Sequence, residues 1–388
     1  MTHRSSLPTR ALALIAAAGL SACATPSSAP RPSPAAQQAS MDAPLINRSE
    51  VVAVVSSGEV ATELEQTAAR WGYALLRKES LDGLGLFLMT FDCPPGIDPR
   101  EASLELERLT PRATVEANHR FDLQAQTAAL PPPGARLYAN RLIGWPDDGC
   151  DPLTRVGMID GAVPADRFPG AVTRDFVEEP SPAARDHGIA VAELLTGDGR
   201  LRGVQLHAAS VVADDANGAA YSGVEPILRA LDWMVREDVS VVNVSLAGPY
   251  NETLAEGFAR AAERGVVVVA AVGNSGPDAA PRYPAALPST IAATAVDSRS
   301  EIYAKAVRGD HVDVAAPGVD VFAAGRYQTG TSMAAPFVTA RLAADRGVRS
   351  VADARARLSR TTRDLGDAGP DPVYGMGLLS IQGRCPAP

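Results

Sequence analysis

The chain has few aromatic residues, few cysteines and no excess of basic residues, and each shortage excludes a class of protein. Its 388 residues include 36 lysines and arginines against 45 aspartates and glutamates, so the net charge is -9. Without a basic run or an interleaved aromatic patch, nucleic acid is not expected as a partner. The four cysteines form no Cys-x-x-Cys pair, and neither a His-Glu-x-x-His motif nor an acidic calcium loop occurs. The sequence therefore predicts no metal site and no cofactor.

Residues 1–23 have the features of an export signal. A basic start and the apolar residues 11–20 precede Leu20-Ser21-Ala22-Cys23, an ending that resembles a bacterial lipobox. The lipobox implies that Cys23 is lipidated and anchors an exported bacterial protein to the cell envelope, on the periplasmic side or at the cell surface. This lipid would be its only contact with a membrane. A cut after Ala24 would instead release a soluble, secreted protein. Residues 24–49, rich in Ala, Pro, Ser and Gln, predict a disordered tether.

Residues 50–123 predict a small α+β domain of ferredoxin-like topology. Apolar patterning indicates strands near 51–55, 73–76, 84–91 and 113–116, and helices near 61–71 and 100–109. This β-α-β-β-α-β order is typical of the ferredoxin-like fold, although an unrelated α+β domain remains an alternative. Residues 124–150 contain Leu130-Pro131-Pro132-Pro133-Gly134 and predict a stiff, exposed linker that would tolerate a maturation cut.

Residues 151–385 predict a larger α/β domain with a mainly parallel sheet. Unbroken apolar strands at 156–159, 240–244 and 266–271 alternate with helices predicted at 223–237 and 252–264. Continuously apolar strands of this kind are buried on both faces, which requires a layer of helices on each side. Active sites in such sheets lie beyond the carboxyl ends of the strands.

Ser332 lies in Gly330-Thr331-Ser332-Met333-Ala334-Ala335-Pro336, where a turn leads into an alanine-rich helix. Backbone N–H groups and the positive end of the helix dipole converge at such a junction. That environment suits a nucleophile whose reaction builds up an oxyanion. Taken alone, the serine could equally be a helix N-cap.

Three further polar residues follow or precede regular elements. Asp160 directly follows the strand at 156–159, a position from which its carboxylate could orient a histidine. His187 is the first residue of a predicted helix that begins His187-Gly188-Ile189. Asp186, just before it, is interpreted as the N-cap of that helix. Asn274, after the strand at 266–271, could donate its side-chain amide to an oxyanion. Individually, Asp160 and Asn274 could simply begin turns.

Together these motifs resemble the active-site motifs of the subtilisin-like serine proteases, over about residues 150–380. The order Asp160, His187, Ser332 is that of subtilisin and differs from the orders of chymotrypsin and of the α/β-hydrolases. Two departures occur: Asp-Gly-Ala replaces the family's Asp-Ser/Thr-Gly, and Ile189 replaces a threonine. The resemblance implies a subtilisin-like three-layer fold and serine endopeptidase activity on protein or peptide substrates, with these three residues as catalytic triad and Asn274 in the oxyanion hole.

The resemblance extends to substrate binding and maturation. Ser245, Leu246, Ala247 and Gly248 match the strand with which the family pairs an extended substrate. Residues 50–123 have the position and topology of the family's propeptide, which implies a zymogen whose N-terminal domain is an intramolecular inhibitor and chaperone. Two alternatives stay open: a permanent regulatory domain, or a catalytically dead peptide-binding module on the cell envelope.

The remaining cysteines allow one disulfide. Apart from Cys23, the chain has Cys93, Cys150 and Cys385, and export to an oxidising compartment permits pairing. Cys150 and Cys385 bracket the predicted catalytic domain, so they are the expected pair. Cys93 is then left over.

Overall fold

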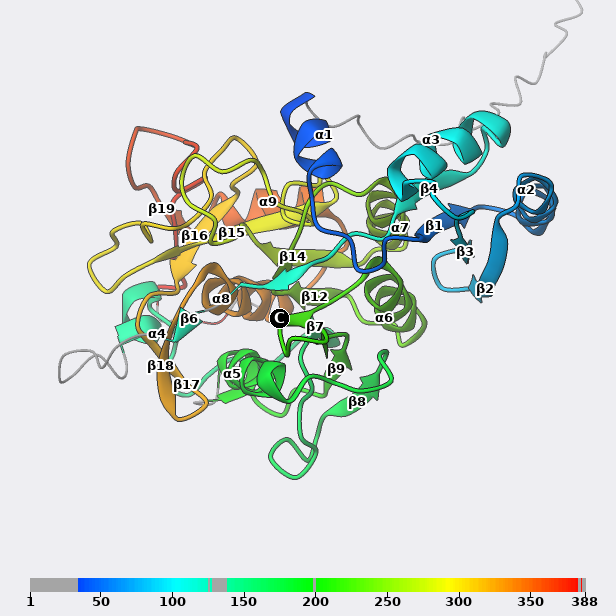
Figure 1. Cartoon of the computed structure of the whole chain (residues 1–388). Helices are drawn as coiled ribbons and strands as arrows, with labels where there is room; N and C mark the ends of the chain where they lie inside the picture. Colours follow the sequence, from blue (N-terminus) through cyan, green and yellow to red (C-terminus); the bar gives the residue numbers. More distant parts are fainter. Residues whose placement is uncertain (1–33, 125, 128–137, 198–199, 383–384, 386–388) are drawn as a thin grey trace, which may run out of the picture.

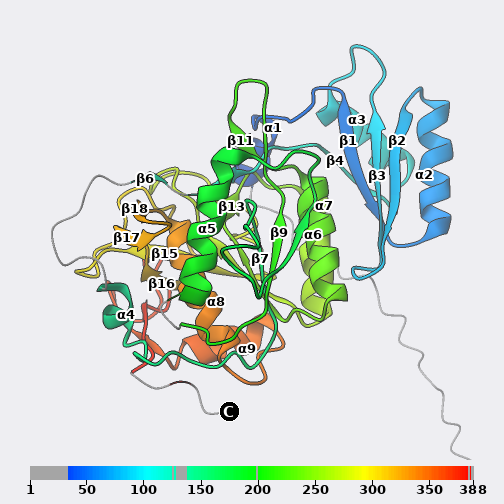
Figure 2. The ribbon, with the colours of Figure 1, turned by 90° about the horizontal axis from the view of Figure 1, so that it is seen from below.

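The computed structural model describes residues 34–124, 126–127, 138–197, 200–382 and 385. A small N-terminal domain lies beside a larger C-terminal domain (Figures 1 and 2). None of the described helices combines the length and apolarity needed to cross a membrane. The export signal and Cys23 lie outside the described residues, as does the proline run at 131–133.

The N-terminal domain is a four-stranded antiparallel sheet with two helices on one face. Its strands are ordered β2-β3-β1-β4. Val51, Ala53 and Val55 of β1 face the helices and share a core with Leu64 and Leu106. The chain order is the predicted β-α-β-β-α-β. Its elements, with the helix that precedes them, are α1 (Pro34–Met41), β1 (Glu50–Val55), α2 (Gly58–Arg70), β2 (Ala74–Leu81), β3 (Leu86–Asp92), α3 (Pro99–Leu109) and β4 (Thr114–Ala117).

The C-terminal domain is built on a mainly parallel sheet, as the sequence predicted. All its neighbouring strands are parallel except the edge pair β19–β20. In spatial order the described strands are β19 (Thr362–Arg363), β20 (Leu378–Leu379), β16 (Val314–Pro317), β15 (Thr290–Val296), β14 (Val267–Ala271), β12 (Val241–Val244), β7 (Val156–Asp160), β9 (Leu206–Ser210) and β8 (Val172–Asp175).

Side chains alternate between the two faces of this sheet, and both faces are apolar. On β14, Val267 and Val269 join the core on one side, and Val268 and Ala270 join the core on the other. Figure 2 shows α5 and α8 on the first side and α6 and α7 on the second. The helices of this domain are α4 (Tyr138–Ile143), α5 (Pro182–Thr196), α6 (Val224–Arg236), α7 (Glu252–Glu263), α8 (Thr331–Ala343) and α9 (Val351–Leu358).

The N-terminal domain packs the open face of its sheet against α6 and α7. Val52, Val54 and Leu88 belong to the same buried core as residues of those two helices. Polar contacts surround this core: both oxygens of Glu225 on α6 accept hydrogen bonds of 2.9 Å from Arg77 on β2. The second face of the small sheet is therefore covered by the larger domain.

The structure corrects part of the tether predicted for residues 24–49. Residues 34–41 form α1, and the Ser40 hydroxyl donates a 2.7 Å hydrogen bond to the Tyr250 carbonyl of the larger domain. Residues 44–46 then pair with residues 118–120 through backbone hydrogen bonds. This segment, residues 34–47, is called the strap below. Its backbone groups find partners on the N-terminal domain, and the Ser40 side chain adds one on the larger domain.

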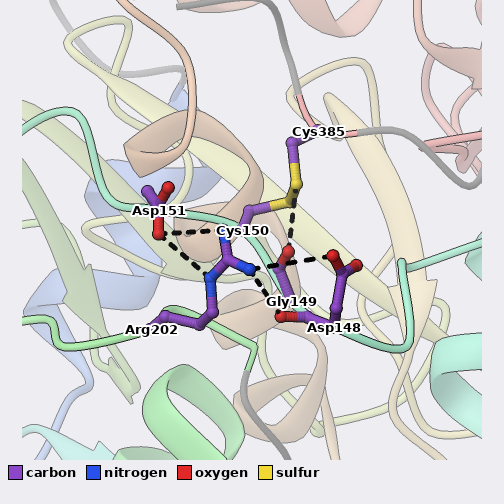
Figure 3. The surroundings of a disulfide bond; sticks show 6 residues. All are labelled: Asp148, Gly149, Cys150, Asp151, Arg202 and Cys385. Carbon is purple, nitrogen blue, oxygen red and sulfur yellow. Dashed lines mark hydrogen bonds and ion pairs between the residues drawn. A yellow bond between two sulfur atoms is a disulfide. The ribbon is translucent and has the colours of Figure 1, made fainter.

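A disulfide joins Cys150, ahead of β7, to Cys385, the pair expected from the sequence (Figure 3). Arg202 lies beside it and forms ion pairs with Asp148 and Asp151. The bond links the two ends of the C-terminal domain. Cys93 is a buried free cysteine of the N-terminal domain, and burial raises the pKa of its thiol to about 11.

Candidate active site

Asp160, His187 and Ser332 meet beyond the carboxyl ends of the parallel strands. The Nδ1 of His187 lies 2.7 Å from Asp160 Oδ1, and its Nε2 lies 3.0 Å from Ser332 Oγ. All three side chains are buried. The structure therefore brings together the three residues for which the sequence predicted a triad, in hydrogen-bonding order.

Two glycines allow α5 to approach β7 closely enough for this contact. A Cβ on Gly161 would lie 2.2 Å from the Ala184 carbonyl oxygen, and one on Gly188 would lie 2.4 Å from the Gly161 carbonyl oxygen. Neither position can hold a side chain without moving the backbone. The unusual Asp-Gly-Ala sequence after β7 thus has a steric reason in this chain.

The predicted start of this helix was wrong. Instead of beginning at His187, α5 begins at Pro182, and Ser181 is the N-cap, accepting a hydrogen bond from the Ala184 N–H. Asp186 is therefore a residue of the helix and pairs with Arg326. A capping serine followed by proline is a common helix start, so the sequence did contain the correct signal.

Ser332 lies in the first turn of α8, which begins at Thr331 after Gly330. This position rules out the N-cap interpretation of Ser332. Asn274 follows β14, and its Oδ1 accepts hydrogen bonds of 3.1 and 3.0 Å from the backbone N–H and hydroxyl of Thr331. The side-chain amide of Asn274 is thereby fixed next to the nucleophile candidate.

The end of the N-terminal domain runs through the cleft as an extended strand. Its segment β5 (Asp122–Leu123) pairs antiparallel with β13 (Leu246–Ala247), the segment predicted to bind substrate. Two hydrogen bonds, of 2.9 and 2.8 Å, join Phe121 to Ser222 on its other edge. Beyond the triad, β6 (Gln126–Thr127) pairs with β18 (Arg326–Thr329). The chain is thus held in the cleft on both sides of residue 125.

Gln124 is the residue that meets Ser332. Its N–H donates a 3.2 Å hydrogen bond to the Ser245 carbonyl, and its own carbonyl oxygen accepts one of 3.2 Å from the Ser332 N–H. The Ser332 hydroxyl also contacts that carbonyl oxygen. The sequence predicts a linker at residues 124–150, and this contact is not part of that prediction. Backbone hydrogen bonds of this kind leave no pattern of side chains in the sequence.

No three His, Cys, Asp or Glu residues within the described parts of the chain are grouped so that they could hold a metal ion. The polar groups of the cleft are the hydroxyl, imidazole, carboxylate and amide described above. This set can perform acyl transfer through proton movement and hydrogen bonding.

A mainly parallel α/β sheet with an Asp–His–Ser arrangement at its carboxyl edge is typical of one class of serine peptidases. Comparison with known proteins agrees: a model of the subtilase family, peptidase S8, matches residues 139–377. Subtilisin DY of Bacillus licheniformis is 32% identical over 251 residues, which are 59% of this chain and 89% of subtilisin DY. The chain therefore belongs to the subtilase family and is a subtilisin-like serine endopeptidase.

Other relatives match over a smaller share of their length. Subtilisin E of Bacillus subtilis strain 168 is 34% identical over 183 residues, which are 44% of this chain and 46% of subtilisin E. Among solved structures, fervidolysin from Fervidobacterium pennivorans, a keratinolytic enzyme related to subtilisin, has a TM-score of 0.66 at 20% identity. The match with fervidolysin covers 87% of this chain and 60% of the fervidolysin chain. The epidermin leader peptide processing protease of Staphylococcus aureus has a TM-score of 0.62 at 15% identity, covering 86% of this chain and 98% of its own. The two structural likenesses concern the fold.

Proposed function

We propose that this chain is the precursor of an exported serine endopeptidase that cleaves itself after Gln124. The observation that carries the proposal is the contact of the Gln124 carbonyl oxygen with both the hydroxyl and the N–H of Ser332. A peptide paired on both sides of its central bond has lost much of its freedom before reaction, which favours attack.

In the proposed reaction, the Ser332 hydroxyl oxygen attacks the carbonyl carbon of Gln124 while His187 Nε2 accepts the hydroxyl proton. Asp160 holds the imidazole in the required tautomer and stabilises the imidazolium. His187 then gives the proton to the departing amine of the next residue. Water attacks the acyl group on Ser332 by the same proton transfers, which frees the carboxylate of Gln124 and restores the hydroxyl.

Two donors are available for the oxyanion of this reaction. The Ser332 N–H already donates to the Gln124 carbonyl oxygen. The Oδ1 of Asn274 is held by Thr331, which leaves the amide Nδ2 to donate as negative charge develops. Loss of one such donor in an enzyme of this type typically costs about 100- to 1,000-fold in turnover.

After the cut, the N-terminal domain remains as an inhibitor. Residues 121–124 still occupy the substrate strand position, and the apolar contact with α6 and α7 does not depend on the cleaved bond. The strap adds further hydrogen bonds to Tyr250 and to residues 118–120. Activity should therefore appear only when this domain dissociates or is degraded.

The signal sequence supports export, and the lipobox supports an anchor at Cys23. Because Cys23 precedes the cut, cleavage after Gln124 would place the lipid and the peptidase on separate pieces. Non-covalent contacts alone would then keep the enzyme at the cell envelope. Radiolabelled palmitate should enter the wild-type fragment and not a Cys23→Ser variant. Labelling of neither would favour the soluble, secreted form.

The test of the function is the intact mass of wild-type protein and of Ser332→Ala, both purified from an exporting host. The wild type should yield a fragment that ends at Gln124 and a second that begins at residue 125, while the variant stays full length. A wild type that stays whole but reacts with a fluorophosphonate would have a permanent regulatory domain. One that neither cleaves itself, nor reacts with the probe, nor digests casein would be a dead peptide-binding module.

A further inference from the structure

The side-chain amide of Gln124 is held at both ends, at one end by the cleft and at the other by its own strand. Its Oε1 accepts a 2.9 Å hydrogen bond from the backbone N–H of Asn274, and its Nε2 donates a 2.9 Å hydrogen bond to the Asp122 carbonyl. Only 7% of the residue is exposed. A backbone N–H can only donate and a carbonyl can only accept, so the two ends of the amide cannot be exchanged.

These two contacts distinguish glutamine from side chains of similar length. Glutamate could accept from Asn274, but its carboxylate could not donate to the Asp122 carbonyl and would face that oxygen with like polarity. Methionine fills a similar volume and satisfies neither group. A buried donor or acceptor without a partner is costly, so the site should discriminate against both.

A second buried side chain lies three residues earlier. Phe121 is fully buried and shares a core with Leu246 and Tyr250. Its ring lies against Gly248, where an added Cβ would be 2.2 Å from the Phe121 Cδ1 atom and 2.5 Å from Cε1. Asp122 and Leu123, between the two buried residues, remain partly exposed. The cleft therefore encloses the first and fourth residues before the cut.

The position of Gly248 is fixed by its neighbours. It exchanges two backbone hydrogen bonds with Tyr283, of 2.8 and 3.0 Å, so its backbone cannot move away from the ring without breaking them. The absence of a side chain at Gly248 is thus what makes room for an aromatic ring.

We propose that the mature peptidase prefers substrates with glutamine immediately before the cut and a large aromatic residue three positions earlier, as in Phe-Xaa-Xaa-Gln. The contact between the Asn274 N–H and the glutamine Oε1 selects the first, and the space over Gly248 admits the second. This inference rests on the proposed function, because it takes residues 121–124 as the part of a substrate that precedes the cut.

The experiment uses enzyme matured from the full-length chain and four acetylated peptides with an aminomethylcoumarin leaving group. The reference is Phe-Asp-Leu-Gln, and the others replace Gln with Glu, Gln with Met, or Phe with Ala. We expect kcat/KM about tenfold lower for the Glu and Met peptides, and about 100-fold lower for the Ala peptide. Equal rates for Gln and Met, or for Phe and Ala, would overturn the corresponding half of the proposal.

A variant tests the room over Gly248. No left-handed backbone is required there, so Gly248→Ala changes only the space next to the ring. It should lower the Phe-to-Ala preference about tenfold or more. Gly170→Ala is the matched control, because its Cβ would meet nothing within 4 Å, and it should keep the wild-type ratio. An unchanged ratio in Gly248→Ala would contradict the proposal.

The outcomes also separate this inference from the function itself. If wild-type enzyme cleaves casein and reacts with a fluorophosphonate but cuts all four peptides at one rate, it is a peptidase without the proposed preference. If it does neither, the proposed function fails and the preference fails with it. The peptide series needs only wild-type enzyme, so a poorly folded variant would not prevent a decision.

Discussion

Arg77 is one of two side chains of β2 that form ion pairs with α6, the other being Glu79, which pairs with Arg229. Replacement of Arg77 by alanine should release the N-terminal domain faster. Two 2.9 Å hydrogen bonds join the guanidinium to the two carboxylate oxygens of Glu225. The Glu225 side chain is 9% exposed and that of Arg77 is 45% exposed. In Arg77→Ala, the carboxylate would keep the Thr90 hydroxyl and Arg229, whose Nη2 lies 3.8 Å away.

The expected size of the effect lies between two limits. Removal of one partner from a fully buried ion pair costs about 3–5 kcal/mol, and exposed pairs contribute about 0–1 kcal/mol. Because Arg77 is half exposed and Glu225 keeps other partners, we expect about 2 kcal/mol, which is about a 30-fold weaker complex. The loss should appear mainly in the dissociation rate.

The assay follows the recovery of peptidase activity after the self-cleavage proposed above, since each dissociation of the N-terminal domain would expose one cleft. Lys78→Ala is the matched control, because Lys78 is the next residue on β2 and pairs with Glu65 inside its own domain, at 2.8 Å. Glu225→Gln completes a double-mutant cycle with Arg77→Ala. If Arg77→Ala dissociates no faster than Lys78→Ala, the ion pair does not hold the domains together and the reasoning is refuted.

Three further predictions concern pH, the disulfide and oxidation. Burial and the nearby Glu107 raise the pKa of Glu116, at the domain interface, from 4.5 to about 8. The complex then keeps a proton that the separated domains release, so its stability should fall as pH rises from about 5 to 8. Dissociation rates in Glu116→Gln should depend less steeply on pH, and the remaining dependence should come from Glu107, whose pKa burial raises to about 7. An equally steep profile in this variant would contradict the role of Glu116. Cys385→Ser breaks the bond to Cys150 across a sequence separation of 235 and should lower the free energy of unfolding by about 2–5 kcal/mol in urea titrations. Wild type and variant unfolding at the same urea concentration would contradict this. Met333 is buried beside Ser332, so peroxide should reduce wild-type activity and spare Met333→Leu; equal sensitivity would exclude its sulfoxide as the cause.

Much of the fold could be predicted because its strands carry their own signal. The apolar runs at 240–244 and 266–271 became β12 (Val241–Val244) and β14 (Val267–Ala271), since strands buried on both faces need a continuous apolar sequence. In the N-terminal domain, the apolar runs that became β1 and β3 are buried along almost their whole length, and the predicted element order was correct. The start of α5 lies five residues before the predicted one, because Ser181 caps the helix and Pro182 begins it, whereas the small residues after His187 indicate only its interior.

The parts that could not be predicted depend on contacts between distant segments. Residues 44–46 pair with 118–120, and Gln124 meets Ser332 across 208 positions. Apart from the Ser332 hydroxyl, these contacts are made by backbone N–H and C=O groups, which residues carry whatever their side chain. Side-chain patterns therefore gave no sign of the strap or of the bound strand.

The sequence by itself determined which residues could form the site, because Asp160, Asn274 and Ser332 each stand next to a strand or helix end that the local pattern indicates. The parallel sheet then brings those ends to one edge. Only the tertiary structure decided what occupies that site. The N-terminal domain docks on α6 and α7, and the position of this docking determines which of its residues enters the cleft. As a result Gln124, and not a residue of the following linker, contacts Ser332.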